Sequence, residues 1–239
     1  CADLASYIRK AIAVARISVL SNPIGVEGAA ALIEVYEKNP QIRTLLGIEE
    51  GVTEVNFSEK NVDVGQTMVL AAELRAGRVT AGVNKVVLSG NPLTGGEPTW
   101  NSATKSLDIQ TDGKDISGVS ALFPSMTQVT DLELSNCGLG PTSMAELAKL
   151  VRDAGAAINS LVLKGNFPCS RISKDNDGQA PWLPGKDFEG WTAMCSALAI
   201  STTITHVDVS ECMLGPEALT PLADAIKVMA GVNALLLSG

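Results

Sequence analysis

The chain has 239 residues, of which 46% are hydrophobic but only 4% aromatic, so it can bury a large aliphatic core. Its formal net charge of −8 argues against a nucleic-acid-binding protein, which needs a basic surface to neutralise phosphates. No apolar run reaches the roughly 18 residues that a membrane span requires.

In chain order, the predicted elements are copies of one unit, which begins with an apolar residue and continues into an apolar–x–apolar strand. The copies begin at Val14, Val52, Val83, Val129, Ile158, Ile204 and Val232. Self-similarity of this kind marks a solenoid, in which each unit buries its apolar face by stacking on its neighbours. Strands are predicted to centre on Ile17–Val19, Val55–Phe57, Val86–Leu88, Leu132–Leu134, Leu161–Leu163, Val207–Val209 and Leu235–Leu237.

Each predicted strand has a period of two, so alternate side chains face the core. In the unit that begins at Val129, Leu132 and Leu134 point inward while Asp131 and Glu133 face solvent. An Asn or Cys follows the strand in four copies. These residues are Asn91, Cys137, Asn166 and Cys212. An inward-pointing Asn can satisfy the backbone groups of the turn that leaves the strand.

A helix follows each strand, because apolar residues then recur at intervals of three and four. The clearest copies are Gly25–Val35, Val64–Leu74, Gly140–Val151 and Gly215–Ile226. Pro141 and Pro216 suit a first helical turn. Asp115 and Asp187 are predicted to be N-caps of two further helices. Leu134, Leu147 and Leu163 are expected to be buried in the core.

Long and short units alternate: Val83 to Val129 is 46 residues, Val129 to Ile158 is 29, and Ile158 to Ile204 is again 46. The extra residues form insertions near 92–113 and 167–185, which contain Trp100 and Trp182, and a shorter insertion lies near 42–51. Residues 105–110 alternate and predict a small additional strand.

A strand and a helix in about 28 residues, with two alternating unit types, resembles the ribonuclease-inhibitor-like subfamily of leucine-rich repeats. The resemblance covers nearly the whole chain. The repeats also resemble those of the Ran GTPase-activator and actin capping-protein-linker type. It implies an α/β fold, a right-handed solenoid shaped as a horseshoe arc, with a parallel sheet on the concave face and helices on the convex face. We expect one domain over residues 1–239 with about seven repeats. Because a terminal repeat needs a capping surface, we also expect the chain to be truncated at its C-terminal end.

The five cysteines are an odd number without close pairs. Cys137 and Cys212 hold the same repeat position with one coil between them, so they are expected about 10 Å apart. A disulfide requires Cα atoms within about 7 Å. We therefore predict reduced, buried thiols and an intracellular, cytoplasmic protein. Cys169, in an insertion, is expected to react sooner than the others.

No motif predicts catalysis, a metal or a cofactor. His206, Asp208 and Ser210 are alternate residues of one strand, about 6.6 Å apart in a row, and no nucleophile elbow accompanies them. The segments 108–113 and 173–178 resemble the first half of a calcium loop but lack its twelfth-position Glu. With one histidine in the chain, no Cys/His set has metal-ligand spacing.

The outward column of the strands is the predicted partner-binding site, and the two Trp-containing insertions form a second candidate patch. The residues concerned are Val87, Glu133, Val162, Asp208, Leu236, Trp100 and Trp182. A mixed apolar and acidic face suits a protein partner. An ordinary solvated sheet surface, and tryptophans that only anchor their own loops, stay open as alternatives.

These patterns favour a non-enzymatic protein–protein interaction scaffold whose partner the sequence does not identify. Two alternatives remain. One is a GTPase-activating protein of the Ran-activator type, although the acidic tail usual in that branch is absent from this sequence. The other is a structural component of a cytoskeletal or ciliary assembly, which would make the chain part of a larger complex.

Overall fold

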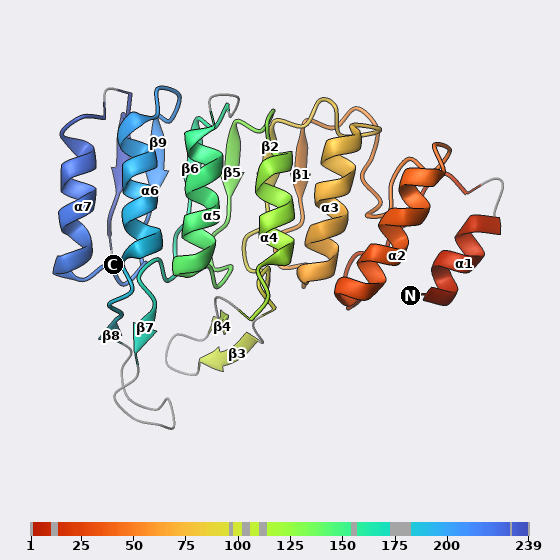
Figure 1. Ribbon diagram of the computed structural model, residues 1–239, viewed down its shortest axis with the longest axis horizontal. Coiled ribbons are helices and arrows are strands. Elements are labelled where there is room, and N and C mark those ends of the chain that lie inside the picture. Colours follow the sequence, from red (N-terminus) through yellow and green to blue (C-terminus); the bar gives the residue numbers. More distant parts are fainter. Residues whose placement is uncertain are drawn as a thin grey trace.

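The computed structural model describes residues 2–10, 14–95, 98–101, 106–109, 114–153, 157–172, 183–229 and 231–238. Figure 1 shows one layer of helices in front of a sheet, with strands and helices both following one another in chain order. The sheet strands are β1 (Glu54–Asn56), β2 (Lys85–Val87), β5 (Asp131–Glu133), β6 (Ser160–Val162), β9 (His206–Asp208) and β10 (Ala234–Leu236). The helices are α1 (Ala2–Lys10), α2 (Gly25–Lys38), α3 (Val64–Ala76), α4 (Ser117–Leu122), α5 (Pro141–Arg152), α6 (Glu189–Ile200) and α7 (Pro216–Ile226), with a 3-10 turn, η1, at Phe123–Ser125.

The six strands form one sheet in the order β1-β2-β5-β6-β9-β10, and every neighbouring pair is parallel. Strands thus alternate with helices along the chain, and the predicted α/β solenoid is confirmed. The pairing is in register, so the middle residues of the strands form one inward row. This row is Val55, Val86, Leu132, Leu161, Val207 and Leu235. The first five of these residues are at most 2% exposed, as the period of two requires.

The strand predicted at Ile17–Val19 is not part of this sheet. In this segment Arg16 and Ser18 make isolated bridges, to Thr44 and Leu46 respectively. The Ile17 and Val19 amides donate to the carbonyl oxygens of Thr44 and Leu45 at 3.0 and 2.9 Å. Residues 44–46 therefore use the hydrogen-bonding groups through which this segment would have joined β1.

A buried carboxylate holds residues 44–46 in that place. Glu73 of α3 is fully buried and accepts hydrogen bonds from the Thr44 hydroxyl and from the Leu45 and Leu46 amides. Burial is the main cause that raises the Glu73 pKa, while these hydrogen bonds oppose it. Arg78 donates to the carbonyl oxygens of Tyr36 and Asn39 at the end of α2 and of Ile42 just beyond it.

The turn after Ile17–Val19, and the turn after each of β1, β2, β5, β6 and β9, is left-handed at one equivalent position. Its residues are Ser21, Glu59, Gly90, Asn136, Gly165 and Glu211, with φ between 53° and 74°. Gly occupies this position in the long units because the side chain of the preceding coil lies over it. A Cβ atom on Gly165 would lie 2.0 Å from Asn136 Oδ1, and one on Gly90 would lie 3.0 Å from Glu59 Cγ.

The predicted role of the inward Asn is confirmed. Asn166 Nδ2 donates to the carbonyl oxygens of Leu134 and Leu163, both at 2.7 Å, and its Oδ1 accepts from the Cys137 and Leu139 amides. Asn91 does the same one super-repeat earlier, donating to Phe57 and Leu88 and accepting from Val62.

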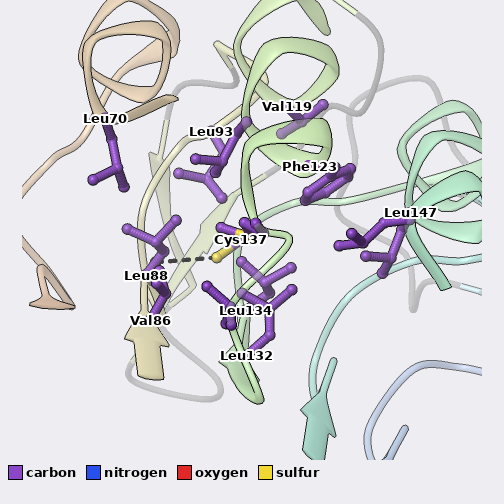
Figure 2. Packing of buried hydrophobic residues seen from close by; sticks show 14 of the residues in the cluster. Leu70, Val86, Leu88, Leu93, Val119, Phe123, Leu132, Leu134, Cys137 and Leu147 are labelled. Carbon is purple, nitrogen blue, oxygen red and sulfur yellow. Dashed lines mark hydrogen bonds between the residues drawn. The ribbon is translucent and has the colours of Figure 1, made fainter. Parts of the chain in front are cut away.

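The short units use sulfur at this position, where the Cys137 and Cys212 thiols donate to the Leu88 and Leu163 carbonyl oxygens at 3.2 Å. Figure 2 shows Cys137 beside Leu88 among the core side chains. In the unit that begins at Val52, Lys60 stands at the Asn position. Gln66 from α3 supplies the amide there and donates to Val19 O and Asn22 O.

Aliphatic side chains from strands and helices fill the space between the two layers (Figure 2). Leu134, Leu147 and Leu163 are fully buried, as predicted. The first turns of adjacent helices approach so closely that only Gly fits. A Cβ on Gly65, Gly118 or Gly190 would come within 2.1, 2.9 or 1.7 Å of a carbonyl oxygen of the preceding coil.

Two antiparallel hairpins project from the same edge of the solenoid, below the helix layer in Figure 1. They are β3 (Pro98–Asn101) with β4 (Ser106–Ile109), and β7 (Arg171–Ile172) with β8 (Leu183–Pro184). The strand β4 overlaps the alternating segment 105–110.

The predicted helix starts are confirmed in part. Pro141 and Pro216 stand in the first turns of α5 and α7. Neither Asp115 nor Asp187 is an N-cap, because Ile116 and Phe188 hold that position in α4 and α6 without a side-chain hydrogen bond. Asp115, one residue earlier, nevertheless accepts from the Ser117 amide at 2.9 Å. The helix α1 had no counterpart in the sequence prediction.

Candidate protein-binding surface

The side chains of the six strands that point away from the helices form a surface that we call the strand face. Its first row is Glu54, Lys85, Asp131, Ser160, His206 and Ala234, and its middle row is Asn56, Val87, Glu133, Val162, Asp208 and Leu236. A third row follows two residues after the strand ends and comprises Ser58, Ser89, Ser135, Lys164, Ser210 and Ser238. Parallel strands that pair in register bring side chains from distant parts of the chain into straight rows about 4.8 Å apart from coil to coil.

The middle row contains all the strand residues proposed from the sequence to bind a partner. Glu133, Val162 and Asp208 are half-buried, and Leu236 is 39% exposed. Val87 differs because it is 5% exposed, although its outward position predicted an accessible side chain. It therefore supports its neighbours and offers little contact area of its own.

The strand face carries more carboxylates than ammonium groups. The carboxylates belong to Glu54, Asp131, Glu133 and Asp208, and the ammonium groups to Lys85 and Lys164. Lys85 Nζ lies 2.8 Å from Glu133 Oε1, and Lys164 Nζ lies 3.0 Å from Glu211 Oε1 in the adjoining turn. Lys85 thus lies near three of the four carboxylates, those of Glu133, Glu54 and Asp131.

The pKa values of the two lysines reflect this excess of negative charge. The hydrogen bond to Glu133 raises the pKa of Lys85, and the charges of Glu133, Glu54 and Asp131 add to the effect. The hydrogen bond to Glu211 raises the pKa of Lys164, with further contributions from the charges of Glu211 and Asp208. Both side chains are solvated, so these ion pairs contribute little to folding stability.

His206, Asp208 and Ser210 are alternate residues along β9 and the turn after it, as the sequence predicted for an ordinary strand. Asp208 Oδ1 accepts from the Ser210 amide at 2.9 Å. Ser210 is 3% exposed, and its hydroxyl shares a 3.2 Å hydrogen bond with the Ser238 hydroxyl. Among the described residues, none forms a cluster of three or more His, Cys, Asp or Glu side chains that could hold a metal ion.

Of the two tryptophans proposed for a second patch, Trp100 lies in β3 opposite Leu107, and Trp182 lies outside the described residues. Sequence reasoning overlooked Trp191, which is fully buried in α6 and donates from Nε1 to Ala218 O at 2.8 Å. Its position next to Gly190 matches that of Val119 next to Gly118. The helical spacing of core residues would have found it.

The described cysteines, Cys137, Cys169, Cys195 and Cys212, are all free and buried. Burial raises the pKa of each thiol to about 12. Cys169 is 1% exposed, so the structure gives it no advantage in reactivity over the others.

Two other features of the described residues bear on function. A shallow depression of about 260 Å³ is bordered by Arg43, Glu50 and Arg78. Arg43 pairs with Glu50 at 2.9 Å and Arg78 caps α2, so both guanidinium groups have structural partners. Among the residues that the structure describes, no helix is long and apolar enough to cross a membrane.

No family model matches the sequence, and no curated protein matches it. Among solved structures, the chain is similar to the tropomodulin C-terminal domain of Caenorhabditis elegans, with 11% identity, 51% of this chain and 65% of that chain covered, and a TM-score of 0.38. It is also similar to the leucine-rich repeat-containing protein LegL7 of Legionella pneumophila, with 17% identity and a TM-score of 0.39. That match covers 93% of this chain and 64% of LegL7. The chain thus spans slightly less than two thirds of the length of either structure.

Proposed function

We propose that this chain is a non-enzymatic interaction scaffold of the ribonuclease-inhibitor-like repeat type, which binds a partner protein through the strand face. The observation that carries the proposal is the middle row, in which the accessible aliphatic side chains of Val162 and Leu236 alternate with the carboxylates of Glu133 and Asp208. Apolar contacts beside charged groups are what protein interfaces combine.

The backbone supports this role because the sheet holds the row rigidly. Every strand of the row is paired in register with its neighbours, so side chains on it lose little backbone freedom on binding. The hydrogen-bonding groups of the inner strands are used within the sheet, so a partner would contact side chains and not backbone. Trp100 and Trp182 remain a proposed second patch, of which Trp100 belongs to β3.

Charge reversal on each face tests the proposal. Glu133→Lys with Asp208→Lys changes the strand face, while Glu37→Lys with Glu217→Lys makes the same change of charge at exposed helix positions. We expect the first pair to abolish capture of a partner from native lysate and the second to leave it intact, with both variants folded by circular dichroism. Loss of capture with the helix pair alone would place the interface on the helices.

The GTPase-activator alternative has a separate assay. If the chain is a scaffold, adding it to purified small GTPases leaves their rates of GTP hydrolysis unchanged. Stimulation of any of them would replace the proposal.

A further inference from the structure

The middle row of the strand face repeats every two coils, and this repeat has a defined length. Glu133 on β5 and Asp208 on β9 are separated by β6 alone, and Val162 of β6 lies between them. Neighbouring parallel strands are about 4.8 Å apart, so the backbone positions of the two residues are about 9.6 Å apart along the solenoid axis. Asn56 and Leu236 extend the row at its two ends.

The charge of the row is only partly neutralised. Glu133 shares Lys85 with Glu54 and Asp131, and Asp208 lies near Lys164, whose ammonium group contacts Glu211. The Lys85 and Glu133 side chains are each 35% exposed, so a cation from outside can reach the carboxylate. Charge complementarity therefore points to a basic ligand.

Resting on the proposed function of the strand face, we propose that its partner contributes a basic segment in the polyproline II conformation, which lies along the solenoid axis with a cationic side chain at every third residue. Three residues of polyproline II advance about 9.3 Å, close to the two-coil repeat of about 9.6 Å. Successive cations then meet Glu133 and Asp208, and the residues between them contact Val162 and Leu236.

The other regular conformations fit the row less well. Side chains on one side of a β-strand recur about every 6.7 Å, and those one heptad apart on an α-helix recur about every 10.5 Å. A β-strand would also need backbone partners, which the inner strands of the sheet do not offer. Polyproline II has no such requirement, because its backbone stays solvated.

Three synthetic peptides of equal charge test the register. One contains five Arg-Pro-Pro triplets, the second has the same composition with its five arginines consecutive, and the third replaces each Pro by Gly. Fluorescence anisotropy with the whole chain is expected to show binding of the first peptide about fivefold tighter than that of either other peptide. This preference is expected to vanish in Glu133→Gln with Asp208→Asn and to persist in the control Glu37→Gln with Glu217→Gln.

Equal affinities, or tighter binding of the peptide with consecutive arginines, would reduce the site to a simple attraction between charges and overturn the proposed register. Absence of binding by all three peptides would also overturn it. The proposed scaffold function would survive either result if Glu133→Lys with Asp208→Lys still abolished capture of the native partner.

Discussion

At the scale of single residues, Asn166 links two consecutive coils through one side chain. Its amide donates to carbonyl oxygens of two coils and accepts from two amides of the Cys137 turn, and it is fully buried. Each buried polar group left without a partner costs about 1–3 kcal/mol.

Replacing Asn166 by Ala is therefore expected to lower the free energy of unfolding by about 2–4 kcal/mol, measured by urea denaturation. The matched control is Asn233→Ala, whose side chain is exposed. Its effect is expected to stay within about 0.5 kcal/mol. Similar effects of the two substitutions would contradict the role of the inward amide.

Glu73 makes stability depend on pH in a direction that its burial determines. Its pKa in the folded protein is raised above the ordinary value of 4.5, so just above pH 4.5 the folded state binds more protons than the unfolded state. The contribution of Glu73 to stability is thus fully present below pH 4.5 and is lost as the pH rises through the folded pKa.

Glu73→Gln removes this titration. Urea denaturation of both proteins at a series of pH values from about 4.5 upward is expected to show an additional loss of stability in the unsubstituted chain alone. The difference between the two curves isolates Glu73 from the other acidic groups. Parallel curves, or a difference of the opposite sign, would show that the carboxylate is not desolvated.

At the scale of the element, the strand-to-helix turn requires a particular pair of residues in adjacent coils. Gly165 has φ of 71°, and the Asn136 side chain of the preceding coil occupies the space where its Cβ would be. The sequence shows that Gly follows a strand here. Only the stacking of coils shows that Asn136 makes the Gly necessary.

Gly165→Ala is expected to destabilise the chain by about 1–3 kcal/mol, from backbone strain and from the contact with Asn136. Adding Asn136→Gly relieves the contact and not the strain. The double variant is expected to recover part of the loss, which thermal or urea denaturation measures as a coupling free energy. Strict additivity would mean that strain alone is responsible.

Strand and helix positions were largely predictable because their determinants are local. Six of the seven predicted strands lie in the sheet, since apolar alternation and a turn residue occur within nine residues of each other. The exception, Ile17–Val19, has the same local pattern. Its departure depends on Thr44 and Leu45, about 26 residues away, and on the buried Glu73.

At the scale of the whole molecule, the core is continuous because each coil packs on the next. Leu163 is fully buried, and its carbonyl oxygen accepts from both Asn166 and Cys212. In a solenoid, stability depends on such nearest-neighbour contacts.

Leu163→Ala leaves the backbone bonds in place but opens a cavity between coils, and is expected to cost about 2–5 kcal/mol. Thermal denaturation checks this against Leu219→Ala, since Leu219 is 42% exposed on α7. An unchanged melting temperature for Leu163→Ala would show that Leu163 does not face the core as assigned.

The sequence by itself determined the repeat, its two alternating unit types and the residues that face outward, because each depends on a pattern within one unit. The middle row could be listed from sequence alone, but its accessible part could not. Tertiary structure decided that Val87 is buried while Leu236 is exposed, and that three carboxylates surround Lys85. Exposure and charge pairing depend on side chains from coils that are distant in sequence, so only their stacking decides them.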